Sequence, residues 1–200
     1  MKLAIVKYNA GNVQSVEFAL NRLGINPIVT DDVRELQTAD KVIFPGVGEA
    51  SSAMDYLRKR GLDKVIKELR QPVLGICLGM QLMCRHSEEN NTDCLGIVDL
   101  NVSKFPPLDK VPHMGWNSIR CADNPLFRGL PSEPYVYFVH SYHAEIGEAT
   151  ICTSEYIEPF TAGLCSGNFF GLQFHPESVM TPEGPRMMAN FLRIAERRGA

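Results

Sequence analysis

The first half of the chain alternates short, continuous apolar runs with segments whose apolar residues recur at helical spacing. The apolar runs, which have the length of buried strands, cover residues 2–8, 27–29, 41–44 and 72–76. The helical segments cover residues 13–23, 51–69 with a break near Gly61, and 78–85. Asn12 is expected to cap the first helix, and Gly24 to end it. Because short connections join strand to helix, we predict a parallel sheet covered by helices on both faces.

The second half has a different pattern. From about residue 96 to 174 the runs are strand-like and are separated by Pro and Gly, as at 135–145 and 169–174. This pattern predicts mixed or antiparallel strands added to the α/β core. The chain then has an amphipathic helical pattern at 184–197. We expect residues 1–200 to form one domain.

Composition and charge exclude several function classes. The chain is 44% hydrophobic and 22% charged, as in an ordinary globular protein. With a net charge of −3, the chain has no excess of positive charge that would favour binding to nucleic acid or to an anionic membrane. No apolar run is long enough to span a bilayer, and the N-terminal run is too short for a signal peptide. These features lead us to expect a cytoplasmic protein.

The six cysteines include no CxxC pair, which argues against a zinc ribbon or a thioredoxin-like centre. We expect reduced thiols that mostly act as small buried hydrophobes, and neither a metal nor a cofactor. His140 and His143 have an H-x-x-H spacing, but in a strand they would point to opposite faces, which disfavours metal binding.

Cys77 stands in Gly75-Ile76-Cys77-Leu78-Gly79, between a predicted strand and a predicted helix. This is the context of a nucleophile elbow with Cys in place of Ser. The flanking glycines allow a sharp turn, and the helix N-terminus favours a thiolate. The N–H of Leu78 would be free to donate to an oxyanion. The alternative is a structural Cys in a turn bounded by glycines.

A thiol nucleophile needs a base, and the base needs a group that orients it. His175 and Glu177 stand in Phe174-His175-Pro176-Glu177, at the end of a strand-like run. In an extended segment these two side chains lie on the same side, so Glu177 can reach the imidazole. On its own the motif could be a surface turn. Together with the Cys77 elbow it indicates a Cys–His–Glu triad.

Two further segments carry candidate contacts. The loop Pro45-Gly46-Val47-Gly48 follows a strand and is a poor match to a dinucleotide-binding motif. It is either an ordinary strand-ending turn or a source of a second oxyanion donor. Trp116, the only Trp, lies in a His-Met-Gly-Trp-Asn run that is either core or a contact surface.

The motifs Gly-Ile-Cys-Leu-Gly-Met-Gln, His-Pro-Glu and Pro-Gly-Val-Gly together resemble the class I (triad) glutamine amidotransferases. Tyr-Asn-Ala-Gly-Asn at 8–12, the run at 110–117 and Tyr-Phe-Val-His-Ser-Tyr at 137–142 narrow the resemblance to glutaminase subunits of imidazole glycerol phosphate synthases. The resemblance implies a flavodoxin-like α/β fold with a parallel or mixed sheet covered by helices and antiparallel strands added in the second half.

The resemblance also implies roles for individual residues. The catalytic residues would be Cys77, His175 and Glu177. The residues at the oxyanion site and around the substrate glutamine would be Gly46, Val47, Gly48, Leu78, Gln81, Glu89, Ser141 and Tyr142. The residues near a partner would be Asn12, Pro112, His113, Met114, Gly115, Trp116 and Asn117.

The implied activity is hydrolysis of L-glutamine through a γ-glutamyl thioester, with no cofactor. The ammonia would pass to a (β/α)8-barrel cyclase subunit in a heterodimer, where it serves histidine biosynthesis. The sequence departs from the family pattern in three segments: Lys7 replaces an Asp, Ser178-Val179 replaces Lys-Ser, and Tyr156-Ile157 replaces Tyr-Gly. The loss of Lys at position 178 puts one partner contact in doubt.

Other functions remain open from the residues. Related subunits serve anthranilate, guanylate or carbamoyl phosphate synthesis, which the His-Met-Gly-Trp-Asn run disfavours. A cysteine peptidase is a second alternative, and Gln81 and Glu89 favour a small polar pocket instead. A non-catalytic binding subunit is a third, which the presence of all three triad residues argues against.

Overall fold

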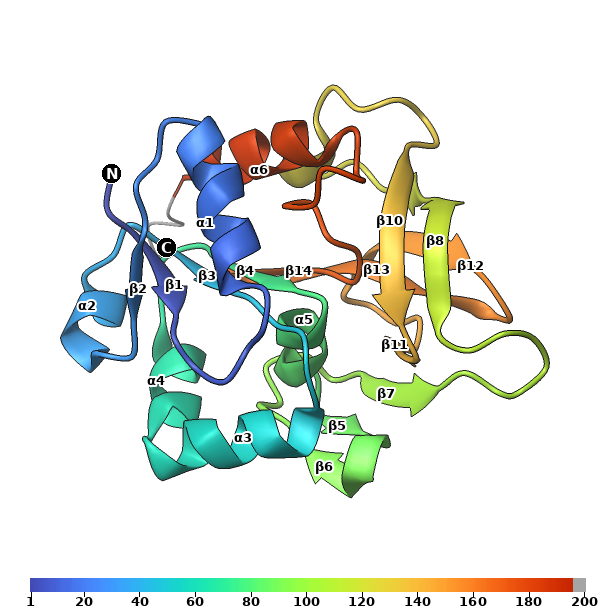
Figure 1. The fold of residues 1–200 in the computed structure, drawn as a ribbon, viewed down its shortest axis with the longest axis horizontal. Helices are drawn as coiled ribbons and strands as arrows, with labels where there is room; N and C mark the ends of the chain where they lie inside the picture. Colours follow the sequence, from blue (N-terminus) through green and yellow to red (C-terminus); the bar gives the residue numbers. More distant parts are fainter. Residues whose placement is uncertain (196–200) are drawn as a thin grey trace.

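The computed structural model describes residues 1–195, in which a 12-stranded mixed sheet runs through the molecule (Figure 1). Its strand order is β2 (Ile28–Thr30), β1 (Leu3–Val6), β3 (Lys41–Phe44), β4 (Val73–Ile76), β14 (Phe169–Leu172), β13 (Pro159–Ser166), β11 (Tyr142–Ala144), β7 (Asn101–Lys104), β5 (His86–Ser87) and β6 (Thr92–Asp93). At the side of this path, β12 (Thr150–Glu155) pairs with β13 and with β9 (Arg120–Cys121). A separate antiparallel pair consists of β8 (His113–Ser118) and β10 (Tyr135–His140).

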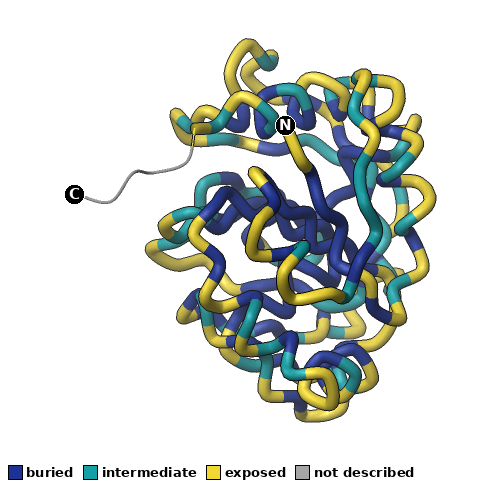
Figure 2. The backbone as a smooth tube through the Cα atoms, turned by 90° about the vertical axis from the view of Figure 1, so that its left-hand side faces the viewer, coloured by how far each residue is buried: buried dark blue, intermediate teal, exposed yellow. Residues whose placement is uncertain are grey.

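Helices cover both faces of the parallel part of the sheet, as the sequence predicts (Figure 1). The helices are α1 (Val13–Arg22), α2 (Val33–Gln37), α3 (Ala50–Lys59), α4 (Leu62–Glu68), α5 (Leu78–Met83) and α6 (Gly184–Arg193), with 3-10 turns η1 (Glu89–Asn91) and η2 (Pro125–Phe127). Alternate residues of β1 enter different cores: Ala4 and Val6 pack in the cluster with α3 and α4, and Leu3 and Ile5 in the cluster with α1 and α6. The strand is buried on both sides, which explains its continuous apolar run (Figure 2).

Several predicted boundaries differ from the structure. The break at Gly61 is confirmed, since this residue has φ 69° between α3 and α4. The single strand expected at 135–145 was wrong, because β10 and β11 belong to different sheets. The chain changes sheets at Ser141, where Nδ1 of His140 donates to the carbonyl of Tyr142 at 2.8 Å and closes a bend. The last helix ends at Arg193, and residues 196–197 of its predicted range lie outside the described residues.

Within residues 1–195, none of the helices combines the length and the apolar character needed to cross a membrane.

Gly79 places α5 directly against the end of β3. A Cβ on Gly79 would lie 1.9 Å from the carbonyl oxygen of Phe44, which is a backbone atom that cannot step aside. We expect Gly79→Ala to lower the free energy of unfolding by about 3 kcal/mol or more, because the helix must move off the strand. Urea denaturation measures this loss.

Gly24 provides the matched control. It has φ 77°, but a Cβ added there would have no atom of the described residues within 4 Å, so Gly24→Ala introduces only backbone strain of about 1 kcal/mol. Equal losses in the two variants would contradict the close packing at Gly79.

Candidate active site

Cys77 occupies the turn between β4 and α5. Its backbone has φ 50° and ψ −109°, an unusual conformation for a residue with a side chain. Gly75 and Gly79 leave no space for a Cβ at the crossing, so the glycines of the motif are required by packing. The N–H of Cys77 donates to the carbonyl of Leu172 at 2.7 Å, which ties the turn to β14. The turn therefore stores strain at the residue that the sequence singles out as a nucleophile.

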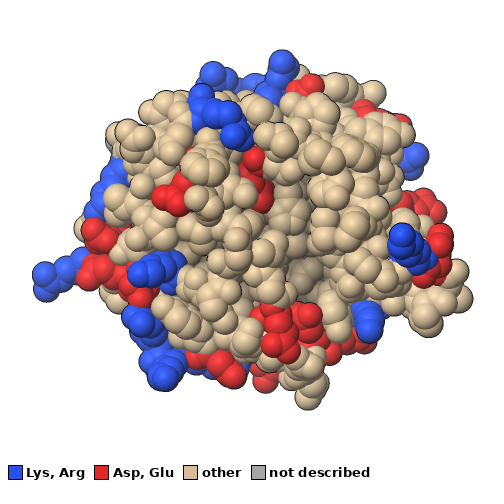
Figure 3. Space-filling model, in the orientation of Figure 1, with Lys and Arg blue, Asp and Glu red and all other residues tan. Residues whose placement is uncertain are grey.

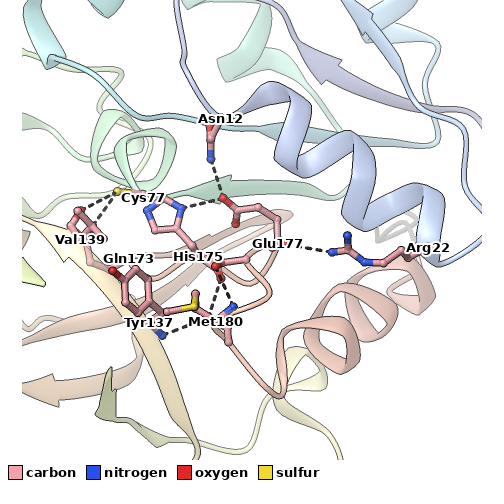
Figure 4. A network of polar contacts seen from close by, with 11 residues as sticks. Asn12, Arg22, Cys77, Tyr137, Val139, Gln173, His175, Glu177 and Met180 are labelled. Atoms are coloured by element: carbon pink, nitrogen blue, oxygen red, sulfur yellow. Dashed lines mark hydrogen bonds and ion pairs between the residues drawn. The ribbon is translucent and has the colours of Figure 1, made fainter. Parts of the chain in front are cut away.

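His175 and Glu177 lie next to Cys77, with the imidazole between the thiol and the carboxylate (Figure 4). Nδ1 of His175 is 2.8 Å from Oε1 of Glu177, as the sequence predicts. The backbone differs from the expectation: β14 ends at Leu172, and residues 176–177 form a turn in which Ser178 N donates to His175 O at 3.2 Å. The turn brings the two side chains together in place of an extended strand.

Asn12 joins this group from the far end of the sequence. Its Nδ2 donates to the same Glu177 oxygen at 2.9 Å (Figure 4). Asn12 is the N-cap residue of α1, as predicted, but its side chain makes no capping hydrogen bond to the helix. Both side chains are buried, and Oε2 of Glu177 has no hydrogen-bond partner among residues 1–195. The carboxylate is thus held by Asn12 and aimed at the imidazole.

The electrostatics of the group favour a charged imidazole. Burial alone would lower the pKa of His175, but the neighbouring Cys77 and Glu177 raise it to about 11. His175 is therefore an imidazolium at neutral pH, facing the Cys77 sulfur on one side and the Glu177 carboxylate on the other. Such a ring can give its proton to a leaving group that departs near Cys77.

Gln173 also contacts the thiol, and no pattern in the sequence pointed to it. Its Nε2 donates to Sγ of Cys77 at 3.6 Å, and its Oε1 accepts from Nε2 of Gln81 at 2.9 Å. Nε2 of Gln81 also donates to the carbonyl of Tyr142 at 2.8 Å. A buried amide chain therefore connects the thiol to the residues around it.

A cavity of about 340 Å³ opens beside Cys77. It is lined by the predicted substrate and oxyanion residues apart from Gly46; these are Val47, Gly48, Leu78, Gln81, Glu89, Ser141 and Tyr142. Oε2 of Glu89 accepts from the N–H of Ala50 at 2.7 Å, and burial raises the pKa of Glu89. The cavity has room for a small polar molecule with one end at the thiol.

The expected oxyanion donor is already occupied. The N–H of Leu78 donates to the carbonyl of Gly46 at 3.2 Å. The sequence suggested a free donor, and the structure contradicts this expectation. The loop that carries this carbonyl is held further upstream by a hydrogen bond from the Tyr8 hydroxyl to the carbonyl of Pro45. An oxyanion at Cys77 gains the Leu78 donor only if the loop turns the Gly46 carbonyl away.

A second cavity, of about 440 Å³, lies on the other side of the group and is lined by His175 and Glu177. Val47 and Val139 line both cavities and so stand between them. The space-filling view shows a hollowed, largely uncharged centre with charged side chains around it (Figure 3). Phe18 and Val179 line the second cavity and are 55% and 84% exposed.

The run at 112–117 divides between surface and interior. Met114 and Trp116 are exposed on one side of β8, and Nε1 of Trp116 donates to Met180 O at 2.7 Å. Pro112 lines the first cavity, and Nδ2 of Asn117 donates to Glu155 O at 2.7 Å. Gly115 lies between the exposed residues with φ 136°.

His113 faces the interior and is only 3% exposed. Its Nδ1 is 3.1 Å from Nε2 of His140, and burial lowers the pKa of His113 to about 4 and that of His140 to about 3. The placement of His140 and His143 on opposite faces was wrong, because both rings pack on Phe105 after the break at Ser141. Among residues 1–195, no three His, Cys, Asp or Glu side chains are grouped to hold a metal ion.

Known proteins resemble the chain over nearly its whole length. Imidazole glycerol phosphate synthase subunit HisH of Bacteroides fragilis is 55% identical over 197 residues, which cover 97% of this chain and 100% of that protein. The subunits of the same name from Yersinia pestis and Idiomarina loihiensis are 46% and 43% identical and also cover 97% of this chain. They match 100% and 98% of those proteins, respectively.

Solved structures share the fold. A protein from Thermoplasma acidophilum, described as a putative GMP synthase subunit, superposes with a TM-score of 0.73 at 24% identity, covering 96% of this chain and 92% of that chain. A glutamine amidotransferase superposes with a TM-score of 0.74 at 19% identity, covering 94% and 96%. The family model for class-I glutamine amidotransferases matches residues 5–195. The chain belongs to the class-I glutamine amidotransferase family.

Proposed function

We propose that the chain hydrolyses L-glutamine with Cys77, His175 and Glu177, and delivers the ammonia to a cyclase partner that makes imidazole glycerol phosphate. One observation carries the proposal. In this chain, which belongs to the class-I glutamine amidotransferases, a strained Cys at a strand–helix turn lies at one end of a small cavity and faces a His–Glu pair. A single domain without a cofactor, acting in the cytoplasm, is part of this proposal.

The geometry supports a sequence of bond changes. The Cys77 sulfur, whose proton His175 holds, attacks the carboxamide carbon of glutamine as a thiolate, and the carbonyl oxygen becomes an oxyanion. The His175 imidazolium protonates the amide nitrogen, the C–N bond breaks, and ammonia leaves. A γ-glutamyl thioester remains. His175 then takes a proton from water, whose oxygen attacks the thioester carbon. The C–S bond breaks, glutamate leaves with its carboxyl proton passing to solvent, and the Cys77 thiolate and the His175 imidazolium are restored.

Glu177 supports both steps without touching the substrate. Its carboxylate fixes the Nδ1 proton of His175, so that Nε2 exchanges protons with substrate and water. It also stabilises the imidazolium form of His175 and so contributes to the raised pKa of about 11. Asn12 keeps the carboxylate in this orientation.

The first cavity supports binding of free glutamine. In the proposal the Glu89 carboxylate pairs with the α-ammonium group of the substrate, while Gln81, Ser141 and Tyr142 surround the amino-acid end. The carboxamide then lies at Cys77. A peptide substrate would have no α-ammonium group at this position, which favours the amino acid over a peptidase substrate.

The second cavity supports transfer of ammonia to a partner. Ammonia becomes ammonium in bulk water, and ammonium is not a nucleophile, so it must travel along a protected route. The relatives named as subunits of imidazole glycerol phosphate synthase suggest a second chain, for which a (β/α)8-barrel cyclase is proposed. Exposed apolar side chains near this cavity offer a surface for it; they are Phe18, Met114, Trp116, Val179 and Met180.

The departures from the family pattern bear on this surface. Ser178 and Val179 line the second cavity. Position 178 therefore lacks the positive charge that is usual in the family, and position 179 carries an apolar side chain in place of Ser. Lys7 is exposed and lies outside both cavities. We therefore expect the change at 178–179 to alter affinity for a cyclase rather than the chemistry at Cys77.

Because the N–H of Leu78 is occupied, we predict that the rate of glutamine hydrolysis depends on the partner subunit. We expect the isolated chain to hydrolyse glutamine slowly, and a cyclase subunit loaded with its ligand to raise kcat by roughly 10²-fold. The physical reason is that removal of one oxyanion donor costs this much, and the Gly46 carbonyl now takes that donor. A coupled glutamate assay on the chain alone, with empty cyclase and with loaded cyclase measures the effect.

Cyclase from which the ligand is omitted controls for simple association. Equal rates with and without the loaded partner would contradict the proposed regulation, although they would leave glutamine hydrolysis itself intact.

A further inference from the structure

Two cysteines face each other across neighbouring strands, away from the group around Cys77. Cys121 of β9 is directly opposite Cys152 of β12, and their sulfur atoms are 2.9 Å apart. We propose that this pair is a modification site, at which a peroxide oxidises the two thiols to an intrachain disulfide.

The strand register suits such a bond. Ala122 N donates to Ile151 O at 2.9 Å, so the adjacent pair of residues is hydrogen-bonded. The cysteines therefore occupy a non-hydrogen-bonded position, where opposite Cα atoms approach to about 4.5 Å and side chains lie closest. This separation is within the range that a disulfide spans, so the bond needs no rearrangement of the backbone.

The two thiols differ in their access to an oxidant. Cys121 is partly exposed and lines a surface hollow, whereas Cys152 is buried with 1% of its surface accessible. Burial also raises the pKa of Cys152. Cys121 is the sulfur that peroxide reaches, and Cys152 is the sulfur that closes the bond.

The chemistry balances with hydrogen peroxide as oxidant. The Cys121 sulfur attacks one peroxide oxygen, the O–O bond breaks, and a sulfenic acid and one water form. The Cys152 sulfur attacks the sulfur of this sulfenic acid, an S–S bond forms, and the S–O bond breaks. The departing hydroxide takes the Cys152 proton as a second water. Two thiols and one peroxide thus give one disulfide and two waters.

The bond would fix a weakly held strand. Within residues 1–195, β9 pairs only with β12, through two residue pairs. It follows β8, the strand that presents Met114 and Trp116. A disulfide would add a covalent bond to the few hydrogen bonds that join β9 to β12. Neither thiol lines the two cavities at Cys77, so the site is separate from the proposed catalysis.

Peptide mapping tests the proposal. The full-length, reduced protein is exposed to one equivalent of hydrogen peroxide, alkylated, and digested with trypsin and a Glu-specific protease. We expect peptide 121–128 joined to peptide 149–155, with a mass two hydrogens below the sum of the two, and its loss on reduction. Glu155 and Glu158 separate Cys152 from Cys165, so the mapping is unambiguous.

Cys121→Ser should abolish the linked peptide, and Cys94→Ser, which alters another partly exposed thiol, should retain it. The bond should form at least about tenfold faster in the folded protein than in urea, because the strands hold the sulfurs together. It should raise the melting temperature by roughly 5 °C over oxidised Cys121→Ser. Absence of the linked peptide while Cys77 is oxidised, or equal rates in urea, would overturn the proposal.

Discussion

Replacing Cys77 with alanine is expected to lower kcat for glutamine hydrolysis by roughly 10⁴-fold or more, without loss of the fold. Alanine keeps the Cβ that the turn already accommodates at φ 50°, but it removes the sulfur that would form the thioester. Gln173 loses one acceptor and keeps its hydrogen bond with Gln81. Glutamate release and far-UV circular dichroism on the same sample separate lost chemistry from lost structure.

Cys94→Ala is the matched control, since Cys94 is a thiol that lines neither cavity beside the triad. It should retain activity within about twofold of the unmodified protein, as expected for a small change to a partly buried side chain away from the site. A Cys77→Ala protein with more than a few per cent of the original rate would show that another group attacks glutamine.

The second large effect is expected for Glu177→Gln, which should lower kcat by roughly 10³–10⁴-fold. The amide has almost the same shape as the carboxylate, but it lacks the negative charge. The Glu177 charge is one of the influences that raise the pKa of His175 to about 11, so the pKa of His175 should fall in the variant. Less imidazolium then remains to protonate the departing ammonia as the pH rises.

The measurement is the pH profile of kcat together with the histidine titration by NMR. Glu158→Gln is a close control, because Glu158 makes a similar 2.9 Å contact to His143 but lies outside the triad. Near-normal kcat in Glu177→Gln, or an equal loss in Glu158→Gln, would contradict the assigned role of Glu177.

The sequence predicted those parts of the molecule that local rules determine. The glycines around Cys77 predicted a tight strand–helix turn, and the structure shows the physical cause: no Cβ fits at Gly75 or Gly79. Continuous apolar runs predicted doubly buried parallel strands, because period-2 patterns disappear when both faces are covered. The proximity of His175 and Glu177 followed from their separation of two residues, although a turn replaces the expected strand end.

Contacts between distant segments could not be predicted in this way. The hydrogen bond from Asn12 to Glu177 joins residues 165 positions apart, and Asn12 looked like a helix cap because caps and long-range donors use the same side chain. The hydrogen bond that occupies the N–H of Leu78 forms only because the loop at residues 45–48 folds back toward Leu78. His113 belongs to an apparent contact motif, but alternation along β8 turns it inward beside exposed Met114.

The central claim is that this chain supplies ammonia from glutamine to a cyclase. The most direct test mixes the purified chain with a cyclase subunit and its nucleotide substrate, and measures imidazole glycerol phosphate with glutamine as the only nitrogen source. We predict product formation that requires glutamine, disappears with Cys77→Ala, and returns when ammonia is added to that variant. Product formation that is insensitive to Cys77→Ala, or no product with glutamine while added ammonia supports the reaction, would contradict the account.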